Sequence, residues 1–480
     1  MSAKKISKSA QDSPPKNMVS GLPTKPFFVR MLVRDIELED AVLDLLDNCI
    51  DGVVRTNLKK TPANKDQPYK GFHAAITMKR DRFEISDNCG GIPRQVAIKS
   101  AFRLGRLPEE IANLPTVGLY GIGMKRAIFK LADSAYVESR HGNSNFRVDF
   151  SEEWLQNDDD WYLPLKKARR TRSGTTVVVD KLKPEIGERF DAGSNFVDDF
   201  KKFVAAHYSL IIHKGFEVKV NGDVIKPEPF KLLTAAATAF ADGTGLAPYC
   251  FRGIVDDVHI ELYAGLYRNL PSETELDEEQ SSRGSSDDAG WSVACNDRIV
   301  VNRDKTRLTG WGDGGVPRYH GQFIAISGLV LLTSDTPEKL PLTTTKRGLE
   351  ASTNVYLVVR EQMQLATKYF TSFTNRWKGK IDELEAIYRD SSPRTVDQLR
   401  SMLKKVSYSQ VRKVAGAERF EPSLPQPKPE DRGQRITFYR PKDKANKLGK
   451  VLFGDEDWDY EQLGGACFDS LYTKHLGRRG

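Results

Sequence analysis

Three short segments of this chain hold the residues whose types and spacing suit chemistry. They read DLLDNCIDG at 44–52, ISDNCGGIP at 85–93 and GLYGIGMKRA at 118–127. The first offers carboxylates and an amide, the second places an Asp before paired glycines, and the third is a glycine-rich turn. In this order they supply a carboxylate helix, an acidic turn and a stretch of free backbone amides, a combination that suits a nucleotide and its phosphates.

The first segment places its polar residues on one helical face. Asp44, Asn48 and Asp51 fall at i, i+4 and i+7, the spacing of one side of an α-helix. A carboxylate one turn from an amide can hold a water next to a phosphate while the amide oxygen binds Mg²⁺, an ion that prefers oxygen ligands and keeps several waters. A polar face toward solvent is the alternative. It is disfavoured because the rest of the helix is apolar, including Cys49 and Ile50 beside the amide.

The second segment ends a predicted strand with a carboxylate. Asp87 precedes an Asn-Cys-Gly-Gly turn, where a buried carboxylate can accept a hydrogen bond from the exocyclic amine of adenine, which guanine lacks. Gly90 and Gly91 let the backbone approach a planar ring closely. An ordinary hairpin turn is the alternative, and it would explain the glycines alone.

The third segment leads into a helix whose first turn can meet an anion. Gly118, Gly121 and Gly123 precede this helix, and exposed amides at a helix N-terminus suit phosphates. Lys125 stands in the first turn, where its charge opposes the helix dipole unless an anion lies between; a solvated lysine is the alternative. Thr175, at the start of a later strand, is placed to close an adenine pocket, or simply begins that strand.

Other common catalytic motifs are missing from the sequence. It contains no GxxxxGK[ST] loop, no GxGxxG after a strand, no HExxH, no paired CxxC and no GxSxG. The five cysteines are scattered, which is typical of a reducing cytoplasm rather than of a disulfide framework. No apolar run approaches the roughly 18 residues of a membrane span. We therefore expect a cytoplasmic or nucleoid-associated protein with no membrane contact.

The charge of the chain is mildly basic and uneven. Its 73 Lys and Arg against 65 Asp and Glu give a formal charge of +8. The stretch KKARRTR at 166–172 and the lysines of residues 1–16 are basic, whereas 158–160 and 273–280 are acidic. Two interpretations stay open: a well-solvated surface, or basic patches for an anionic partner such as nucleic acid.

The elements that must position these residues form two layers. Helices over about 37–56 and from about Gly123 are expected to cover one face of an antiparallel sheet, which is a two-layer α/β sandwich of the α+β class rather than a doubly wound fold. The segment PFFVRMLV at 26–33 is expected to form a strap or edge strand. A hairpin is expected around Asn221–Gly222, and a long amphipathic helix at about 350–390.

The three segments together resemble the motifs DxxxN, DNxGG and GxxGxG of the GHKL ATPases, which share the Bergerat fold. The motifs cover about residues 25–185, and the resemblance extends to about 350 by architecture because a transducer domain with a loop lysine follows in several members. The run CNDRIVVNRDKTRLTGWG and the later TTTKRGL are most similar to MORC and MutL-like ATPases and their bacterial relatives.

The resemblance implies a role for each candidate residue. Asp44 takes the place of the general base, Asn48 becomes the Mg²⁺ ligand and Asp87 reads adenine. Lys346, a loop lysine whose neighbours alone imply no site, would reach the γ-phosphate from the second domain. The remaining ATP-binding residues are Gly91 of the acidic turn, the lid residues Gly118, Gly121 and Gly123, and Lys125 and Thr175.

Two departures from the family pattern matter. Many members have Glu where this chain has Asp44, and the side chain is then one methylene shorter, so slow turnover is expected. Many also have Gly where Cys89 stands, which changes the turn and leaves the role of Asp87 in place.

The domain organisation combines the same resemblance with the composition along the chain, which sets the Lys-, Ser- and Pro-rich tail and the Pro-rich linker apart. It comprises a disordered tail at 1–26, a GHKL ATPase domain at 27–190, a smaller α/β transducer domain at 191–350, a helical segment at 351–420, a linker at 421–433 and a small C-terminal cap at 434–480.

The resemblance implies an ATP-driven switch that uses ATP and Mg²⁺. We expect a slow ATPase that closes as a homodimer on ATP and acts on DNA through its basic segments, in bacterial defence or DNA compaction. Alternatives stay open: a chaperone for protein clients like the ninety-kilodalton heat-shock protein, and a non-hydrolysing adenine-nucleotide sensor. A sensor histidine kinase is disfavoured because residues 1–36 contain no histidine.

Overall fold

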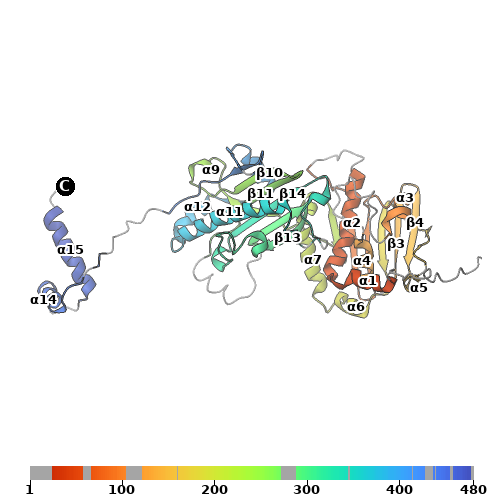
Figure 1. The fold of residues 1–480 in the computed structure, drawn as a ribbon, viewed down its shortest axis with the longest axis horizontal. Coiled ribbons are helices and arrows are strands. Elements are labelled where there is room, and N and C mark those ends of the chain that lie inside the picture. The colour runs from red at the N-terminus through yellow and green to blue at the C-terminus, as the bar shows by residue number, and fades with distance from the viewer. Residues whose placement is uncertain are drawn as a thin grey trace, which may run out of the picture. The chain divides into compact units, whose positions relative to one another are not determined.

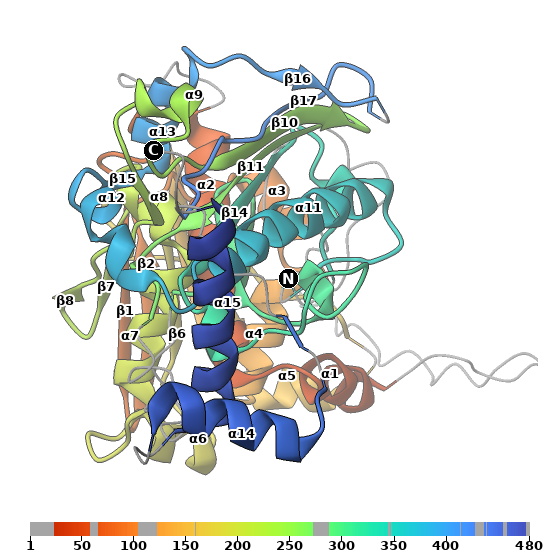
Figure 2. The same ribbon diagram turned by 90° about the vertical axis from the view of Figure 1, so that its left-hand side faces the viewer.

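The computed structural model describes residues 24–57, 66–103, 122–158, 160–271, 288–343, 346, 348–412, 414–427, 436–437, 439–454 and 458–476. The chain divides into two compact units, Met1–Pro427 and Lys428–Gly480. Both are drawn in Figure 1 and Figure 2. Each unit is described by itself.

An eight-stranded sheet forms the first layer of the larger unit. The strand order is β5-β4-β3-β6-β2-β1-β7-β8. All neighbours are antiparallel except β1 and β7, which are parallel, so the sheet is mixed rather than purely antiparallel. Its strands are β1 (His73–Lys79), β2 (Arg82–Asp87), β3 (Ala135–His141), β4 (Ser144–Phe150), β5 (Lys166–Lys167), β6 (Gly174–Val179), β7 (Glu217–Val220) and β8 (Asp223–Val224).

Helices cover one face of this sheet and form the second layer (Figure 1). Alternate residues of β1, which are Ala74, Ile76 and Met78, are buried against the apolar stripe of α2 that the sequence predicted. The predicted two-layer α/β sandwich is therefore confirmed. Its helices are α1 (Lys25–Arg34), α2 (Leu38–Asn57), α3 (Arg94–Val96), the π-helical turn Ala97–Ala101, α4 (Gly123–Leu131), α5 (Glu152–Gln156), α6 (Pro184–Phe190), α7 (Phe196–His207) and α8 (Ser209–His213).

A seven-stranded sheet builds the rest of the larger unit, in the order β13-β12-β14-β11-β10-β17-β16. Residues alternate along β11, so Ile260 and Leu262 pack toward α11 while Tyr263 joins the core that contains α13. Figure 2 shows these two helices on either side of β11 and β14. The strands are β10 (Tyr249–Val255), β11 (Val258–Leu266), β12 (Gly290–Cys295), β13 (Arg298–Asp304), β14 (Ile326–Thr333), β16 (Ser409–Gln410) and β17 (Glu418–Phe420).

Shorter elements complete this part of the chain. A two-stranded sheet pairs β15 with β9. The helices are α9 (Ala239–Asp242), α11 (Asn354–Arg376), α12 (Glu385–Arg389) and α13 (Val396–Leu403). The small strands are β9 (Lys231–Thr234) and β15 (Ser392–Thr395), and 3-10 turns occur at Arg307–Thr309, Gly321–Phe323, Pro337–Lys339 and Ile381–Leu384.

The structure differs from the sequence prediction in three places. PFFVRMLV lies in helix α1 rather than in a strap or strand. Lys25 anchors this helix, because its buried ammonium donates to the carbonyls of Trp154 and Asp160 at 2.9 and 2.5 Å. The hairpin at Asn221 pairs through β7 with β1 and extends the first sheet beyond residue 190.

The third difference concerns the long helix. It ends at Arg376 instead of near 390 and packs on the second sheet. The strands β16 and β17 add to that same sheet, so residues 351–420 are part of its layers rather than a separate helical segment.

The smaller unit consists of two helices, α14 (Lys442–Phe453) and α15 (Tyr460–Leu476). Gly449 allows the Trp458 ring to lie against α14, since a Cβ at this glycine would be 2.2 Å from the ring. The Trp458 ring also stacks on Phe453 with centroids 6.1 Å apart.

Candidate nucleotide site

Helix α2 carries four buried carboxylates: Asp40 lies in its first turn, and the other three lie farther along the helix. Asp44, Asp47 and Asp51 are 4%, 1% and 2% exposed, while Asn48 is exposed. Burying a charge is costly unless it is paired. The partners of these carboxylates therefore define what the site can do.

Asp44 pairs with cations from two different parts of the fold. Arg126 of α4 approaches its Oδ2 with Nη2 at 2.5 Å and Nε at 3.2 Å, and Lys346 Nζ lies 3.3 Å from its Oδ1. Gly123, the first residue of α4, permits this approach because a Cβ there would lie 3.1 Å from the Asp44 carboxyl carbon. Both oxygens of the candidate base are thus engaged.

Asp47 has three polar partners, and the sequence analysis did not single it out. Its Oδ2 lies 2.7 Å from Lys346 Nζ, and its Oδ1 accepts from Arg298 Nε at 3.1 Å and from the Tyr208 hydroxyl at 2.7 Å. Burial alone would raise the pKa of the Asp47 carboxyl, but Lys346, Arg298 and the Tyr208 hydrogen bond lower it below its ordinary value. Asp47 is therefore an ionised carboxylate in the folded protein.

Lys346 reaches α2 from a loop beyond the second sheet. Its backbone has φ +55°, and its N–H donates to the Thr343 carbonyl at 2.9 Å. Burial works to lower the pKa of Lys346, but the carboxylates of Asp47 and Asp44 raise it above the ordinary value. A loop lysine is usually solvated, whereas this one is 9% exposed. The structure thus brings Lys346 and Asp44 together, two candidates that are far apart in the sequence.

Asp87 lies at the end of β2, buried as predicted. Its Oδ1 accepts from the Cys89 N–H at 2.7 Å. Burial raises the pKa of the Asp87 carboxyl above its ordinary value. The Cys89 and Thr175 N–H groups and the nearby charge of Arg170 act to lower this pKa, but burial has the larger effect. Because none of the ion pairs among the described residues holds this carboxyl, it keeps acceptor capacity for a donor such as an amine.

The glycines after Asp87 serve the protein's own packing. Gly91 has φ +72°, and a Cβ on it would lie 2.1 Å from the carbonyl oxygen of Arg140. The carbonyl of Gly90 contacts His141 Nδ1 at 2.7 Å. The turn is therefore held against β3, and Gly91 is required whether or not an adenine ring lies above it.

Thr175 and Arg170 lie on the far side of the Asp87 turn. The Thr175 hydroxyl is 3.1 Å from the Ser139 hydroxyl, which accepts from the Ile92 N–H at 2.8 Å. Arg170 donates to the Asp87 carbonyl and to the Ser86 hydroxyl, the latter at 3.2 Å. Arg170 was predicted as part of a basic surface patch, but it is half-buried and ties the segment between β5 and β6 to the end of β2.

The remaining candidates give a mixed picture. Lys125 is 2% exposed and donates to the Ala101 carbonyl at 3.0 Å, so it is not a solvated lysine. Gly118 and Gly121 lie outside the described residues. Across the described ranges no three His, Cys, Asp or Glu side chains gather as metal ligands. The amide of Asn48 is exposed, and an amide oxygen suits Mg²⁺, an ion that keeps several waters beside its protein ligands.

Comparison with known families identifies the domain that contains α2 and β2. The family model for histidine kinase-, DNA gyrase B- and HSP90-like ATPases matches residues 36–184. Residues 36–184 are a GHKL-type ATPase domain. The match includes Asp44, Asn48 and Asp87, and it ends before Lys346. No curated protein matches the chain.

The matched residues 36–184 contain the α2 and β2 motifs, and ATP binding is what this family of domains supports. None of the helices in the described ranges has the length and apolar character needed to cross a membrane. Sequence reasoning missed five residues of the site, although Asp47 lies inside the first motif and Arg126 inside the third. The contacts of Arg126, Arg170, Tyr208 and Arg298 become visible only through tertiary packing.

Proposed function

We propose that this protein is a slow, Mg²⁺-dependent ATPase that switches conformation on binding ATP, of the MORC and MutL-like kind. The observation that carries the proposal is the contact of Lys346 with Asp44 and Asp47 on α2. A residue from beyond the second sheet thereby lies at the catalytic helix. A γ-phosphate bound beside α2 would draw Lys346 away from these carboxylates. It would thereby change the contact between α2 and the loop that follows the second sheet.

Each residue of the site has a role in this proposal. Asp44 accepts a proton from the attacking water, Asn48 contributes an oxygen to Mg²⁺, and Asp87 accepts from the adenine amine with Thr175 beside it. Mg²⁺ supplies positive charge to the phosphate oxygens. Lys346 meets the γ-phosphate, and the phosphates lie along the start of α4. The backbone groups proposed there belong to Gly118, Gly121 and Gly123, with Gly91 in the adenine turn and Lys125 in the first turn of α4.

Slow turnover follows from the contacts of Asp44. Its carboxylate is paired with Arg126 at 2.5 Å and with Lys346 at 3.3 Å. With both oxygens held by cations, neither is free to take a proton from water, so one of these contacts must loosen before a water can be activated. The same observation favours a second candidate, a non-hydrolysing adenine-nucleotide sensor in which Asp44 stays paired.

Single-turnover measurements separate the two. Protein in excess over radiolabelled ATP, with Mg²⁺ or with a chelator, should release ADP only when the metal is present. If bound ATP remains intact over many hours, the ATPase proposal fails and the non-hydrolysing sensor takes its place. Light scattering with a non-hydrolysable analogue tests the switch, because closure as a homodimer doubles the mass.

The dimer proposal has a surface to support it. Helix α1, the first element of the described residues, exposes Phe27 and Met31 one helical turn apart, at 55% and 49%. Changing both to Ser should prevent the analogue-induced dimer while leaving analogue binding intact. A monomer with the analogue in the unchanged protein would overturn the dimer proposal.

DNA is the proposed partner, in the cytoplasm or nucleoid, through basic residues of the 166–172 segment. Lys166, Lys167 and Arg169 are exposed. A protein client is the alternative, and ATPase stimulation by duplex DNA against stimulation by an unfolded protein distinguishes them.

A further inference from the structure

Three consecutive residues at one hairpin turn hold three different parts of the larger unit. The turn joins β12 to β13, and Asn296 and Asp297 adopt left-handed backbone conformations with φ +46° and +67°. Asn and Asp tolerate this region better than most residues. Both side chains of the turn are half-buried, and the buried Arg298 follows at once.

Asn296 holds the chain that leads to Lys346. Its side-chain amide donates to the Ser334 carbonyl at 3.1 Å and accepts from the Ser334 N–H at 3.0 Å. Ser334 directly follows β14, and the chain continues from there to the loop of Lys346.

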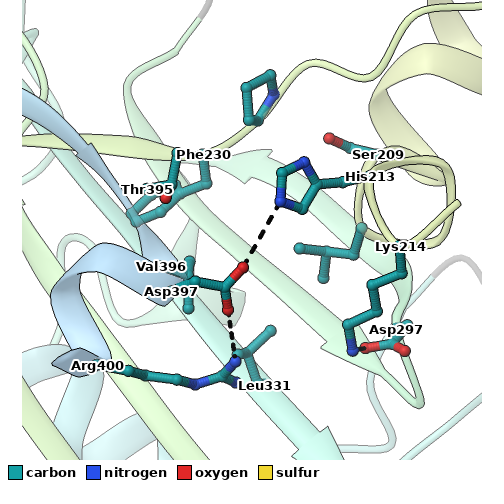
Figure 3. Close-up of a pocket in the computed structure, with 12 residues that line it drawn as sticks. Ser209, His213, Lys214, Phe230, Asp297, Leu331, Thr395, Val396, Asp397 and Arg400 are labelled. Carbon is teal, nitrogen blue, oxygen red and sulfur yellow. Dashed lines mark hydrogen bonds and ion pairs between the residues drawn. The ribbon is translucent and has the colours of Figure 1, made fainter. Parts of the chain in front are cut away.

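Asp297 holds the ATPase-domain side. One oxygen lies 2.6 Å from Lys214 Nζ, just before β7, and the other accepts from the Tyr69 hydroxyl at 3.2 Å. Figure 3 shows the Lys214 and Asp297 pair at the edge of a small hollow, beside His213, Asp397 and Arg400.

Arg298 holds the catalytic helix itself. It is 4% exposed, and its Nε lies 3.1 Å from Asp47 Oδ1. Its guanidinium carbon sits 4.3 Å from the centroid of the Tyr208 ring, and the Tyr208 hydroxyl donates to the same Asp47 oxygen. Asp47 is thus shared between Arg298 on one side and Lys346 on the other.

We propose that Asp47 and Arg298 are positioning residues that set how readily Lys346 leaves α2 for the γ-phosphate of ATP. This inference rests on the proposed role of Lys346. When Lys346 departs, Asp47 keeps Arg298 and Tyr208, so no buried carboxylate is left unpaired. Without Arg298, Lys346 becomes the main cation for Asp47 and is trapped there, because an unpaired buried charge is strongly unfavourable.

The test compares a non-hydrolysable ATP analogue with ADP by titration calorimetry on the full chain. Arg298→Met should lower the ratio of analogue affinity to ADP affinity about tenfold or more, since breaking a buried pair has large effects. ADP affinity itself should stay unchanged, because ADP has no γ-phosphate for Lys346 to meet.

The double variant Asp47→Asn, Arg298→Met removes both charges together. The neutral amide that replaces the Asp47 carboxylate no longer traps Lys346, so the affinity ratio should return to at least its original value. Because the double variant leaves no unpaired buried charge at this position, it can still be measured if Arg298→Met does not fold. Arg298→Lys keeps a cation near Asp47, so its affinity ratio should lie between those of Arg298→Met and the unchanged protein.

Matched controls separate this role from a structural one. Arg303→Met removes another ion-paired arginine of β13, one that contacts Glu228 at 3.1 Å, and should leave the affinity ratio unchanged. Equal losses for analogue and ADP in Arg298→Met, or no recovery in the double variant, would overturn the inference. Lys346→Ala is measured in the same series. If neither Lys346→Ala nor Arg298→Met changes the affinity ratio, the proposed role of Lys346 fails. If Lys346→Ala lowers the ratio and Arg298→Met does not, only the inference about Asp47 and Arg298 fails.

Discussion

The ammonium nitrogen of Lys346 lies 3.3 Å from the Oδ1 oxygen of Asp44. This contact joins a carboxylate of α2, within the matched residues 36–184, to a loop beyond the second sheet. In the proposed function, a γ-phosphate entering the site would compete with Asp44 for this cation, which would couple nucleotide binding to the position of the Lys346 loop. Ligands shift such equilibria only by their difference in affinity for the two states.

Removing the charge of Asp44 should stop hydrolysis without abolishing ATP binding. Asp44→Asn keeps the shape of the side chain and removes the base, and loss of a general base typically lowers the rate by roughly 10²–10⁴-fold. Single-turnover ADP formation measures this, with Glu39→Gln near the start of α2 as the matched control. Turnover within a factor of about three of the unchanged protein would be incompatible with a general-base role.

Asn48 should carry the Mg²⁺ dependence of nucleotide binding. Its exposed amide oxygen is the neutral ligand available on this face of α2, so Asn48→Ala should remove the gain in affinity that Mg²⁺ gives. Titration of a fluorescent ATP analogue with and without Mg²⁺ measures that gain directly. If the gain persists in the variant, the metal is held elsewhere.

Asp87 should select adenine over guanine. A hydrogen bond to a charged acceptor contributes about 1.5–3 kcal/mol, so Asp87→Ala should weaken ATP binding about tenfold or more and narrow the difference between ATP and GTP. Thr77→Ala, on the neighbouring strand β1, is the control. Intact ATP affinity in Asp87→Ala would place the adenine pocket away from the β2 turn.

Asp47 and Asp87 should affect stability with opposite signs. The pKa of Asp47 is lowered from its ordinary value of 3.8 because Lys346 and Arg298 overcome the effect of burial. Its ionised form therefore adds stability above pH 3.8, which is lost as pH falls through the lowered value. Burial raises the pKa of Asp87 above 3.8, so its ionisation costs stability at pH values above that raised pKa.

Urea unfolding across the acid to neutral range tests this contrast. At neutral pH, Asp47→Asn should lower the free energy of unfolding, and the deficit should persist down to the ordinary value of 3.8. Asp87→Asn should equal or exceed the unchanged protein at neutral pH, and any gain should shrink as pH falls toward 3.8. The same sign of effect for both variants would contradict the assigned charge states.

Local pattern predicted the parts of this site that a single element supplies. The stripe of α2, the strand ending at Asp87 and the helix beginning at Gly123 follow from spacing within a dozen residues. The partners of Asp44 and Asp47 could not be predicted, because Arg126, Arg298 and Lys346 meet α2 only through tertiary packing. Helix α1 was not predicted because Lys25 was assigned to the disordered tail. Its ammonium is in fact buried and donates to backbone carbonyls in and just after α5, a contact that local sequence does not indicate.

Duplex DNA binding should depend on the exposed members of the basic segment alone. If Lys166, Lys167 and Arg169 hold phosphates, log K falls with log salt at a slope of about −0.9 per phosphate neutralised. Changing the three to Ala should flatten that slope by up to about three units without altering sequence preference, since phosphate contacts carry none.

Arg170 should be left in place in that experiment, because it bonds the Asp87 carbonyl and its loss would disturb the nucleotide site. Lys166 already pairs with Asp149 at 2.8 Å, so its share of the slope should be the smallest of the three. The competing explanation is that these side chains only protect the edge strand β5 from pairing with another sheet, as charged edges do. A gel-shift series from low to moderate salt, with and without the ATP analogue, distinguishes the two. DNA that is not retained even at about 50 mM salt, where phosphate contacts are strongest, would exclude the nucleic-acid partner and leave a protein client as the target of the switch.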